Sequence, residues 1–182
     1  QYATLMTDGT MRADNIDITM SLTDGYWNFI STPYDVRAGD ITCETAGTNW
    51  VIRRYDGEAR AAVNLNNTWV NMGEDDILEA GKGYIMHCSY SNSRYNYRVF
   101  HFPALNNQNK NLIFSASDRT IQLAEYQSEY AHNRSWNLIG NPYPAYIEIG
   151  SMNLEAPITV WDGYSGYHAF SPIDDYYVLC PG

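Results

Sequence analysis

The phrase that decides the fold occurs twice in this chain, as "SWNLIGNPYPAYIEI" at 135–149 and as "YWNFISTPYDV" at 26–36. A catalytic motif rarely needs two copies, whereas a duplicated structural unit produces them. A shift of 109 positions brings the following pairs together: Trp27 with Trp136, Asn28 with Asn137, Ile30 with Ile139, Pro33 with Pro142 and Tyr34 with Tyr143. The repetition therefore predicts a structural unit that has been copied in tandem.

The match extends in both directions from the repeated phrase. Residues 3–18 align with 112–127 without a gap, and each segment predicts a strand, a polar turn and a strand. Residues 49–62 match 156–170, and 74–86 match 173–182. We expect two copies of one β module, 1–105 and 106–182. The second copy lacks the last hairpin of the first, and such an open strand edge recruits a partner strand.

Short β-rich runs dominate the rest of the chain. Examples are "NWVIRRY", "NTWVNM", "KGYIMHCSY", "YNYRVFHF" and "PITVWDG". Gly, Asn, Asp and Pro separate them at intervals typical of an all-β sandwich or barrel. We expect each copy to be a sandwich-like unit, with a jelly roll as one form of it. Residues 119–132 have some helical character, but alternation in their repeat partner favours a strand. In the repeated phrase we expect Trp, Leu and Ile to be buried, and Gly140, Asn141 and Pro142 to end the strand at a rigid corner.

Composition limits the classes of partner. The 182 residues are 45% hydrophobic and 18% charged, with a formal net charge of −10. An acidic surface repels phosphate backbones and anionic lipid, so we expect no nucleic-acid binding. The chain has no apolar run of about 18 residues, so we expect no membrane insertion. Cys43 and Cys88 either pair or remain reduced, and the sequence leaves both alternatives open.

The repeated phrase, followed by "ITVWDGYSGY" and "IDDYYVLCPG", resembles a module repeated in large secreted and surface proteins of the Bacteroidetes. The resemblance covers 135–182 well and 26–86 more loosely. It implies a secreted or outer-surface location and a place beside other domains of a longer chain or a surface protein partner. The family has no assigned chemistry, so the resemblance transfers no catalytic residues.

The residues themselves offer little for catalysis. No histidine lies in a nucleophile motif, and Cys88 directly follows His87, so on a strand the two side chains point to opposite faces. We therefore expect a protein that is not an enzyme and that needs no cofactor.

Two acidic pairs recur in the two copies, Asp75–Asp76 and Asp174–Asp175. Adjacent carboxylates on an extended chain diverge, so they do not suit a glycosidase. The favoured interpretation is a turn in which Asp accepts hydrogen bonds from nearby backbone N–H groups. The alternative is a Ca²⁺ site formed by these oxygen-rich loops.

Aromatic residues around two Asp-Gly turns are the best candidates for ligand binding. One turn offers Trp161, Tyr164, Tyr167 and His168, and the equivalent turn offers Arg53, Arg54, Tyr55 and Arg60. Two interpretations stay open: these side chains alternate into the core, or they form two related sites on which sugars stack. The sequence thus predicts a non-catalytic extracellular β module for adhesion, display or spacing. The alternative is an accessory carbohydrate-binding module of a glycan-degrading protein.

Overall fold

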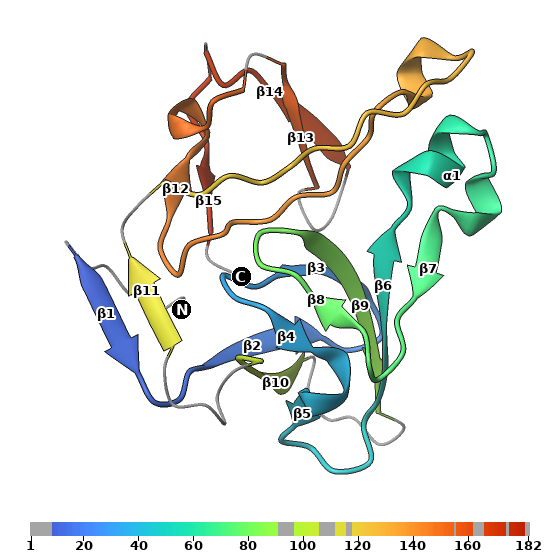
Figure 1. Ribbon diagram of the computed structural model, residues 1–182. Helices are drawn as coiled ribbons and strands as arrows, with labels where there is room; N and C mark the ends of the chain where they lie inside the picture. The colour runs from blue at the N-terminus through green and yellow to red at the C-terminus, as the bar shows by residue number, and fades with distance from the viewer. Residues whose placement is uncertain are drawn as a thin grey trace.

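The protein is mostly β, arranged as several small antiparallel sheets with one short helix (Figure 1). The computed structural model describes residues 9–90, 97–105, 112–115 (backbone only), 118–154, 156–161, 166–173 and 175–180. The strands are β1 (Thr10–Ala13), β2 (Asp17–Thr23), β3 (Trp27–Ser31), β4 (Val36–Arg37), β5 (Thr42–Cys43), β6 (Asn49–Tyr55), β7 (Trp69–Asn71), β8 (Ile77–Leu78), β9 (Gly83–Ser89), β10 (Tyr97–Pro103), β11 (Leu112–Ser115), β12 (Ile147–Glu148), β13 (Ile158–Trp161), β14 (Tyr167–Phe170) and β15 (Val178–Leu179). The helix α1 is Gly57–Ala61.

Two sheets of the N-terminal half share one hydrophobic core. One sheet has the order β3-β9-β6-β7 and the other β2-β10-β5. Met86 and Cys88 of the first sheet and Phe100 and Phe102 of the second are fully buried in the same cluster. Burial raises the pKa of the Cys88 thiol to about 11, so that thiol stays protonated at neutral pH. Cys43, Cys88 and Cys180 are all unpaired by disulfides.

The C-terminal half contains two two-stranded sheets, β12-β15 and β13-β14, and a long extension. We call residues 119–143 the arm. Its two limbs run side by side in Figure 1, and a 3-10 turn at Ala131–Asn133 lies near its tip. The expected strand at 119–132 is absent.

The arm lacks a ladder because its backbone donors reach side chains of the opposite limb. The amide of Ala124 donates to Asn137 Oδ1 (2.9 Å), and that of Tyr126 donates to Ser135 Oγ (3.2 Å). The amide of Arg119 donates to the hydroxyl of Tyr143 (2.9 Å). Side-chain acceptors thus satisfy donors that a ladder would otherwise take.

The repeated asparagine makes the same contact in both halves, which we call the Asn bracket. Asn28 Oδ1 accepts from the Thr23 amide (2.8 Å), and its Nδ2 donates to the Thr23 carbonyl (3.1 Å). Asn137 brackets Ala124 in the same way, at 2.9 Å for each bond. The bracketed residue lies five positions before Asn28 but thirteen before Asn137. The expectation of an ungapped match before the phrase is therefore wrong, because the arm holds extra residues.

A second local match follows the phrase. In β4-β8, Val36 pairs with Leu78, and in β12-β15, Ile147 pairs with Leu179. A 3-10 turn follows each first strand, at Ala38–Asp40 and at Ile149–Ser151. These resemblances are local, so two tandem sandwich-like copies remain a prediction.

The two copies of the phrase also contact each other through glycines. The Gly83 amide donates to the Leu138 carbonyl (3.0 Å), and the Gly140 amide donates to the Gly81 carbonyl (2.8 Å). A Cβ on Gly140 would lie 2.0 Å from Ser31 Cβ. Gly140 is therefore needed for close approach and not for a left-handed conformation, since its φ is not positive.

Candidate functional site: an outward aromatic face

The four-stranded sheet has one face toward the core. Its other face is covered at Gly83 and Ile85 of β9, which are buried, and is exposed at Trp27 and Phe29 of β3. Ile30, Ile52 and Met86 point into the core. Side chains alternate along a strand, so the residues directly before and after each of these point to the opposite face. The outward set, which we call the aromatic face, is Trp27 and Phe29 of β3, Arg53 and Tyr55 of β6, and Trp69 of β7. Trp27 and Phe29 are 39% and 38% exposed. An aromatic surface of this kind is typical of a binding site.

Ring contacts connect the members of the aromatic face. The guanidinium of Arg53 lies over the Trp27 ring, 4.6 Å from its centroid, and its Nε donates to Asn71 Oδ1 (2.8 Å). Phe29 meets Trp69 edge-on at 6.4 Å, and Trp69 meets Tyr55 edge-on at 5.1 Å. These contacts hold the rings in fixed orientations before any ligand arrives.

The helix α1 brings Arg60 to one end of the aromatic face. Asp56 caps the helix by accepting from the Ala59 amide (2.9 Å), and the short polar and alanine-rich run that follows favours a helix. Arg60 lies over the Trp136 ring of the arm at 4.7 Å. A Cβ on Gly57 would lie 2.4 Å from the Trp136 carbonyl, so glycine permits this packing. We had expected only a turn here.

The repeated tryptophans are thus not buried, contrary to expectation. Trp27 is 39% and Trp136 is 38% exposed. Each carries an arginine on its ring, Arg53 and Arg60 respectively. The cation covers the indole while leaving it near the surface, so a tryptophan at this position does not require a core.

The β13-β14 hairpin lies near the same end. Trp161 and Tyr167 oppose each other with ring centroids 4.9 Å apart, as Tyr55 and Trp69 do in the first half. Tyr167 is 63% exposed. Tyr167 is close enough to Tyr55 to affect the pKa of the Tyr55 hydroxyl. This pKa is raised, mainly by burial and further by Tyr167 and Asp56, while Arg60 lowers it.

Two polar atoms at this end have no hydrogen-bond partner among the described residues. They are the Tyr55 hydroxyl and Arg60 Nε, and both are covered from solvent. Arg60 lowers the pKa of Tyr55 through its charge and through a hydrogen-bond interaction between the two side chains, but the geometry of that interaction is too poor to pair the Tyr55 hydroxyl or Arg60 Nε. Covered, unpaired donors are costly, at about 1–3 kcal/mol each.

The structure brings four of the eight predicted ligand residues to this end of the aromatic face, and a fifth, Arg53, lies on the face itself. The four are Tyr55, Arg60, Trp161 and Tyr167. Arg54 lies on the opposite face of β6 from Tyr55, and His168 is exposed beside Tyr167 on β14. Tyr164 lies outside the described residues. The prediction of two separate aromatic turns thus becomes one shared region.

Sequence reasoning missed Trp27, Phe29 and Trp69. It did offer Arg53, and the alternation in "NWVIRRY" places Arg53 and Tyr55 on one face. Recognising Trp27 required the strand order, because β3 and β6 meet only through β9.

The predicted acidic residues have separate contacts. Asp76 accepts from the Gly73 amide and Asp175 accepts from the Ser171 amide, each at 2.7 Å. Asp75 pairs with Arg37. Asp174 lies outside the described residues. Among the residues that the structure describes, no three His, Cys, Asp or Glu side chains gather in a metal-binding group.

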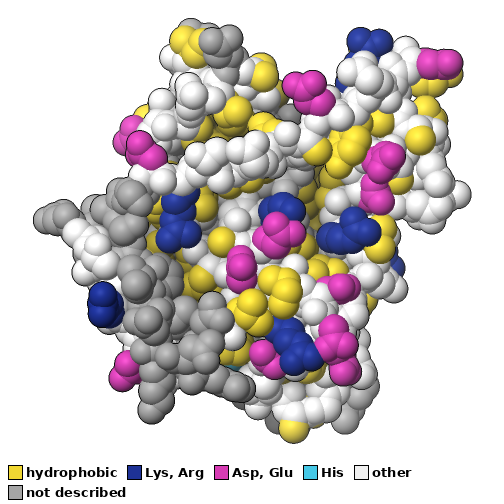
Figure 2. Space-filling model, viewed as in Figure 1, with side chains coloured by type: hydrophobic (Ala, Val, Ile, Leu, Met, Phe, Trp, Pro, Cys, Tyr) yellow, Lys and Arg dark blue, Asp and Glu magenta, His cyan; other side chains and the backbone are white. Residues whose placement is uncertain are grey.

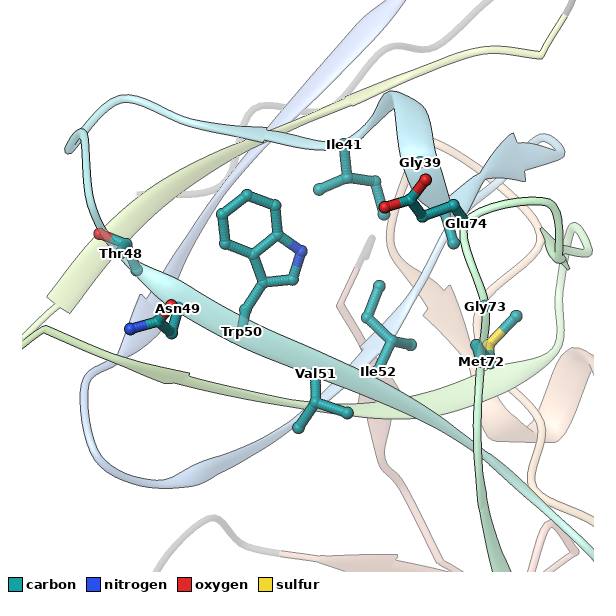
Figure 3. A pocket seen from close by; sticks show the side chains of 11 residues that line it. Gly39, Ile41, Thr48, Asn49, Trp50, Val51, Ile52, Met72, Gly73 and Glu74 are labelled. Carbon is teal, nitrogen blue, oxygen red and sulfur yellow. The ribbon is translucent and has the colours of Figure 1, made fainter.

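A hollow of about 360 Å³ lies on the other side of β6. Figure 3 shows Trp50, Ile41 and Ile52 around it, with Met72 and Glu74 across from them. Trp50 also meets Phe100 edge-on at 5.4 Å, so it belongs partly to the core. The hollow shares no residue with the aromatic face.

On the face seen in Figure 2, hydrophobic side chains gather around the middle of the molecule, with acidic and basic side chains among them. Within the described part, no helix has the length and apolar character needed to cross a membrane. No protein-family model, no curated protein and no solved structure matches the chain.

Proposed function

We propose that this chain is a non-catalytic β-rich module of a secreted or outer-surface protein, serving adhesion, display or spacing. The observation that carries the proposal is the aromatic face, on which Trp27 and Phe29 remain more than a third exposed. An outward sheet face with fixed aromatic rings suits recognition better than chemistry. The resemblance to Bacteroidetes surface modules supports the location, and other domains of a longer chain or a surface protein are the expected partners.

We also infer that the chain consists of two tandem sandwich-like units, 1–105 and 106–182. The two Asn brackets, the two arginine-covered tryptophans and the matching pairs β4-β8 and β12-β15 support this inference. A unit copied for its framework keeps such contacts, whereas a copied active site would keep reactive groups.

The location is tested on intact cells that make the full-length protein. Cells are treated with an added protease, and the module is then detected with an antibody. We expect the protein to be degraded on intact cells or recovered from the medium, while a cytoplasmic marker stays intact. Recovery only from the interior of lysed cells contradicts the proposal.

The second candidate is an accessory carbohydrate-binding module. It is favoured by the fixed rings of Trp27 and Phe29 together with the donors of Arg53, since sugars stack on aromatic faces and hydrogen-bond beside them. A glycan array with the full chain tests it, and loss of a positive signal in Trp161→Ala or Trp27→Ala locates the site. Ca²⁺ at the acidic turns is tested by repeating the array with a chelator.

A further inference from the structure

We propose that the aromatic face, extended by Arg60 and Tyr167, is one continuous site for an acidic polysaccharide whose sugars carry carboxylates. This inference rests on the carbohydrate-binding candidate above and names the ligand class. The site would run from Trp27 and Arg53 at one end to Tyr55, Arg60 and Tyr167 at the other.

Two local arginines indicate an acidic ligand. The chain as a whole has 21 acidic and 11 basic side chains, so its net charge opposes an anion and the attraction comes from these arginines alone. Arg37, Lys82 and Arg98 each have a carboxylate partner. Among the described residues, Arg53 and Arg60 form no ion pair, which is also true of Arg12, Arg54, Arg119 and Arg134, but of these only Arg53 and Arg60 stack on a tryptophan. Two unpaired guanidinium groups on one track suit carboxylates on successive sugars.

The unpaired donors indicate where one carboxylate would bind. The Tyr55 hydroxyl and Arg60 Nε can both donate, and neither has an acceptor among the described residues. The raised pKa of Tyr55 keeps its hydroxyl protonated at neutral pH, and therefore able to donate. A single carboxylate has enough lone pairs to accept from both. Both atoms are covered, so a ligand would reach them by moving the outer side chains of Arg60 or Tyr167 aside.

The exposed aromatic rings would bind the sugar rings of the ligand. Tyr167 is 63% exposed, and Trp27 and Phe29 expose about equal fractions, 39% and 38%. The C–H faces of a pyranose ring can stack on such rings without a large ordering cost, because the rings are already held by Arg53 and Trp69. The face thus offers apolar contact along the track and charge at two points on it.

The test measures binding of the full chain to a galacturonic acid tetrasaccharide by calorimetry, with its fully methyl-esterified form as the matched neutral ligand. We expect the acid to bind at least tenfold more tightly than the ester, and binding to weaken as salt is added. Tyr55→Phe, Arg60→Gln and Arg53→Gln should each weaken binding of the acid about tenfold. Arg37→Gln removes the same charge away from the aromatic face and should leave binding unchanged.

Tyr55→Phe removes only the hydroxyl, so it keeps the variant set informative if an arginine variant fails to fold. A cooperative thermal transition in each variant, with a midpoint lowered by no more than about 4 °C, shows that the fold persists. Equal binding of acid and ester would overturn the acidic ligand while leaving the carbohydrate-binding candidate in place. No binding of either ligand, or binding that all three variants leave intact, would overturn the site. None of these results bears on the cell-surface location, which the protease experiment tests separately.

Discussion

The two copies of the repeated phrase have similar sequences but different backbone hydrogen bonding. Trp27–Ser31 forms strand β3, paired along its length with β9. In the matching residues 136–140 of the second copy, only Ile139 forms a β bridge, with Lys82. Yet both asparagines bracket an earlier residue, and both tryptophans lie under an arginine. The comparison teaches that the side-chain contacts of the phrase are retained where the ladder is not.

The largest expected effect comes from breaking the contact between the two copies. Gly140→Ala would place a methyl group against Ser31 and the Lys82 carbonyl, so we expect the free energy of unfolding to fall by about 3 kcal/mol. Urea unfolding measures this change. Gly9→Ala serves as the control, because a Cβ there meets nothing within 4 Å. An unchanged midpoint in Gly140→Ala would mean that the two copies do not meet as described.

The Asn brackets offer the sharpest comparison of the copies. Asn28→Ala and Asn137→Ala each remove a set of side-chain bonds to backbone groups, so we expect each to cost about 2 kcal/mol. Asn67→Ala, which removes a single exposed side-chain bond, should cost far less. A large cost for Asn28→Ala with none for Asn137→Ala would show that the phrase keeps its role only in the first copy.

The arginine-covered tryptophans should contribute less to stability. Arg53→Gln and Arg60→Gln remove a cation from an indole face, and we expect each to lower the free energy of unfolding by about 0.5 to 1 kcal/mol. Unfolding followed by tryptophan fluorescence measures both. Similar decreases for the two variants would show that this contact stabilises both copies equally. A decrease larger than that of Asn28→Ala or Asn137→Ala would contradict the expected order of effects.

The smallest expected effect is a pH dependence of stability that is confined to the N-terminal half. His101 lies between Asp17 (2.6 Å) and Glu44 (3.2 Å), and these carboxylates raise its pKa, the hydrogen bond with Asp17 most of all. A raised pKa in the folded state stabilises the protein below the ordinary histidine pKa of about 6.5, and this contribution is lost as pH rises through the raised value.

His101→Gln should therefore remove a small decline in stability between mildly acidic and mildly alkaline pH. Hydrogen exchange of individual amides would show the change in β2 and β10 and leave the arm unaffected. A pH-dependent change centred on the arm would contradict the assignment to His101.

Sequence reasoning found the strands better than it found their surroundings. The run "NWVIRRY" coincides with β6, and "YNYRVFHF" largely with β10, because alternation of side chains is a local property. The sequence predicts a strand at 119–132 because nothing local shows that Asn137 and Ser135 accept hydrogen bonds from its amides.

The candidate site depended still more on contacts far apart in the chain. Tyr55, Arg60, Trp161 and Tyr167 were identified as aromatic and basic residues beside turns, but their proximity follows only from the fold. The repeated Trp27 and Trp136 were expected in the core because hydropathy does not reveal an arginine that arrives from another strand or from α1.

The Asn bracket has a consequence for how this chain can change. One asparagine side chain ties two backbone points together whether five or thirteen positions separate them. Closing a longer loop costs little additional entropy, about 0.6 kcal/mol per doubling of length. The tip of the arm is therefore a natural insertion point, where evolution or an engineer can lengthen the chain or graft a foreign peptide while the rest keeps its shape.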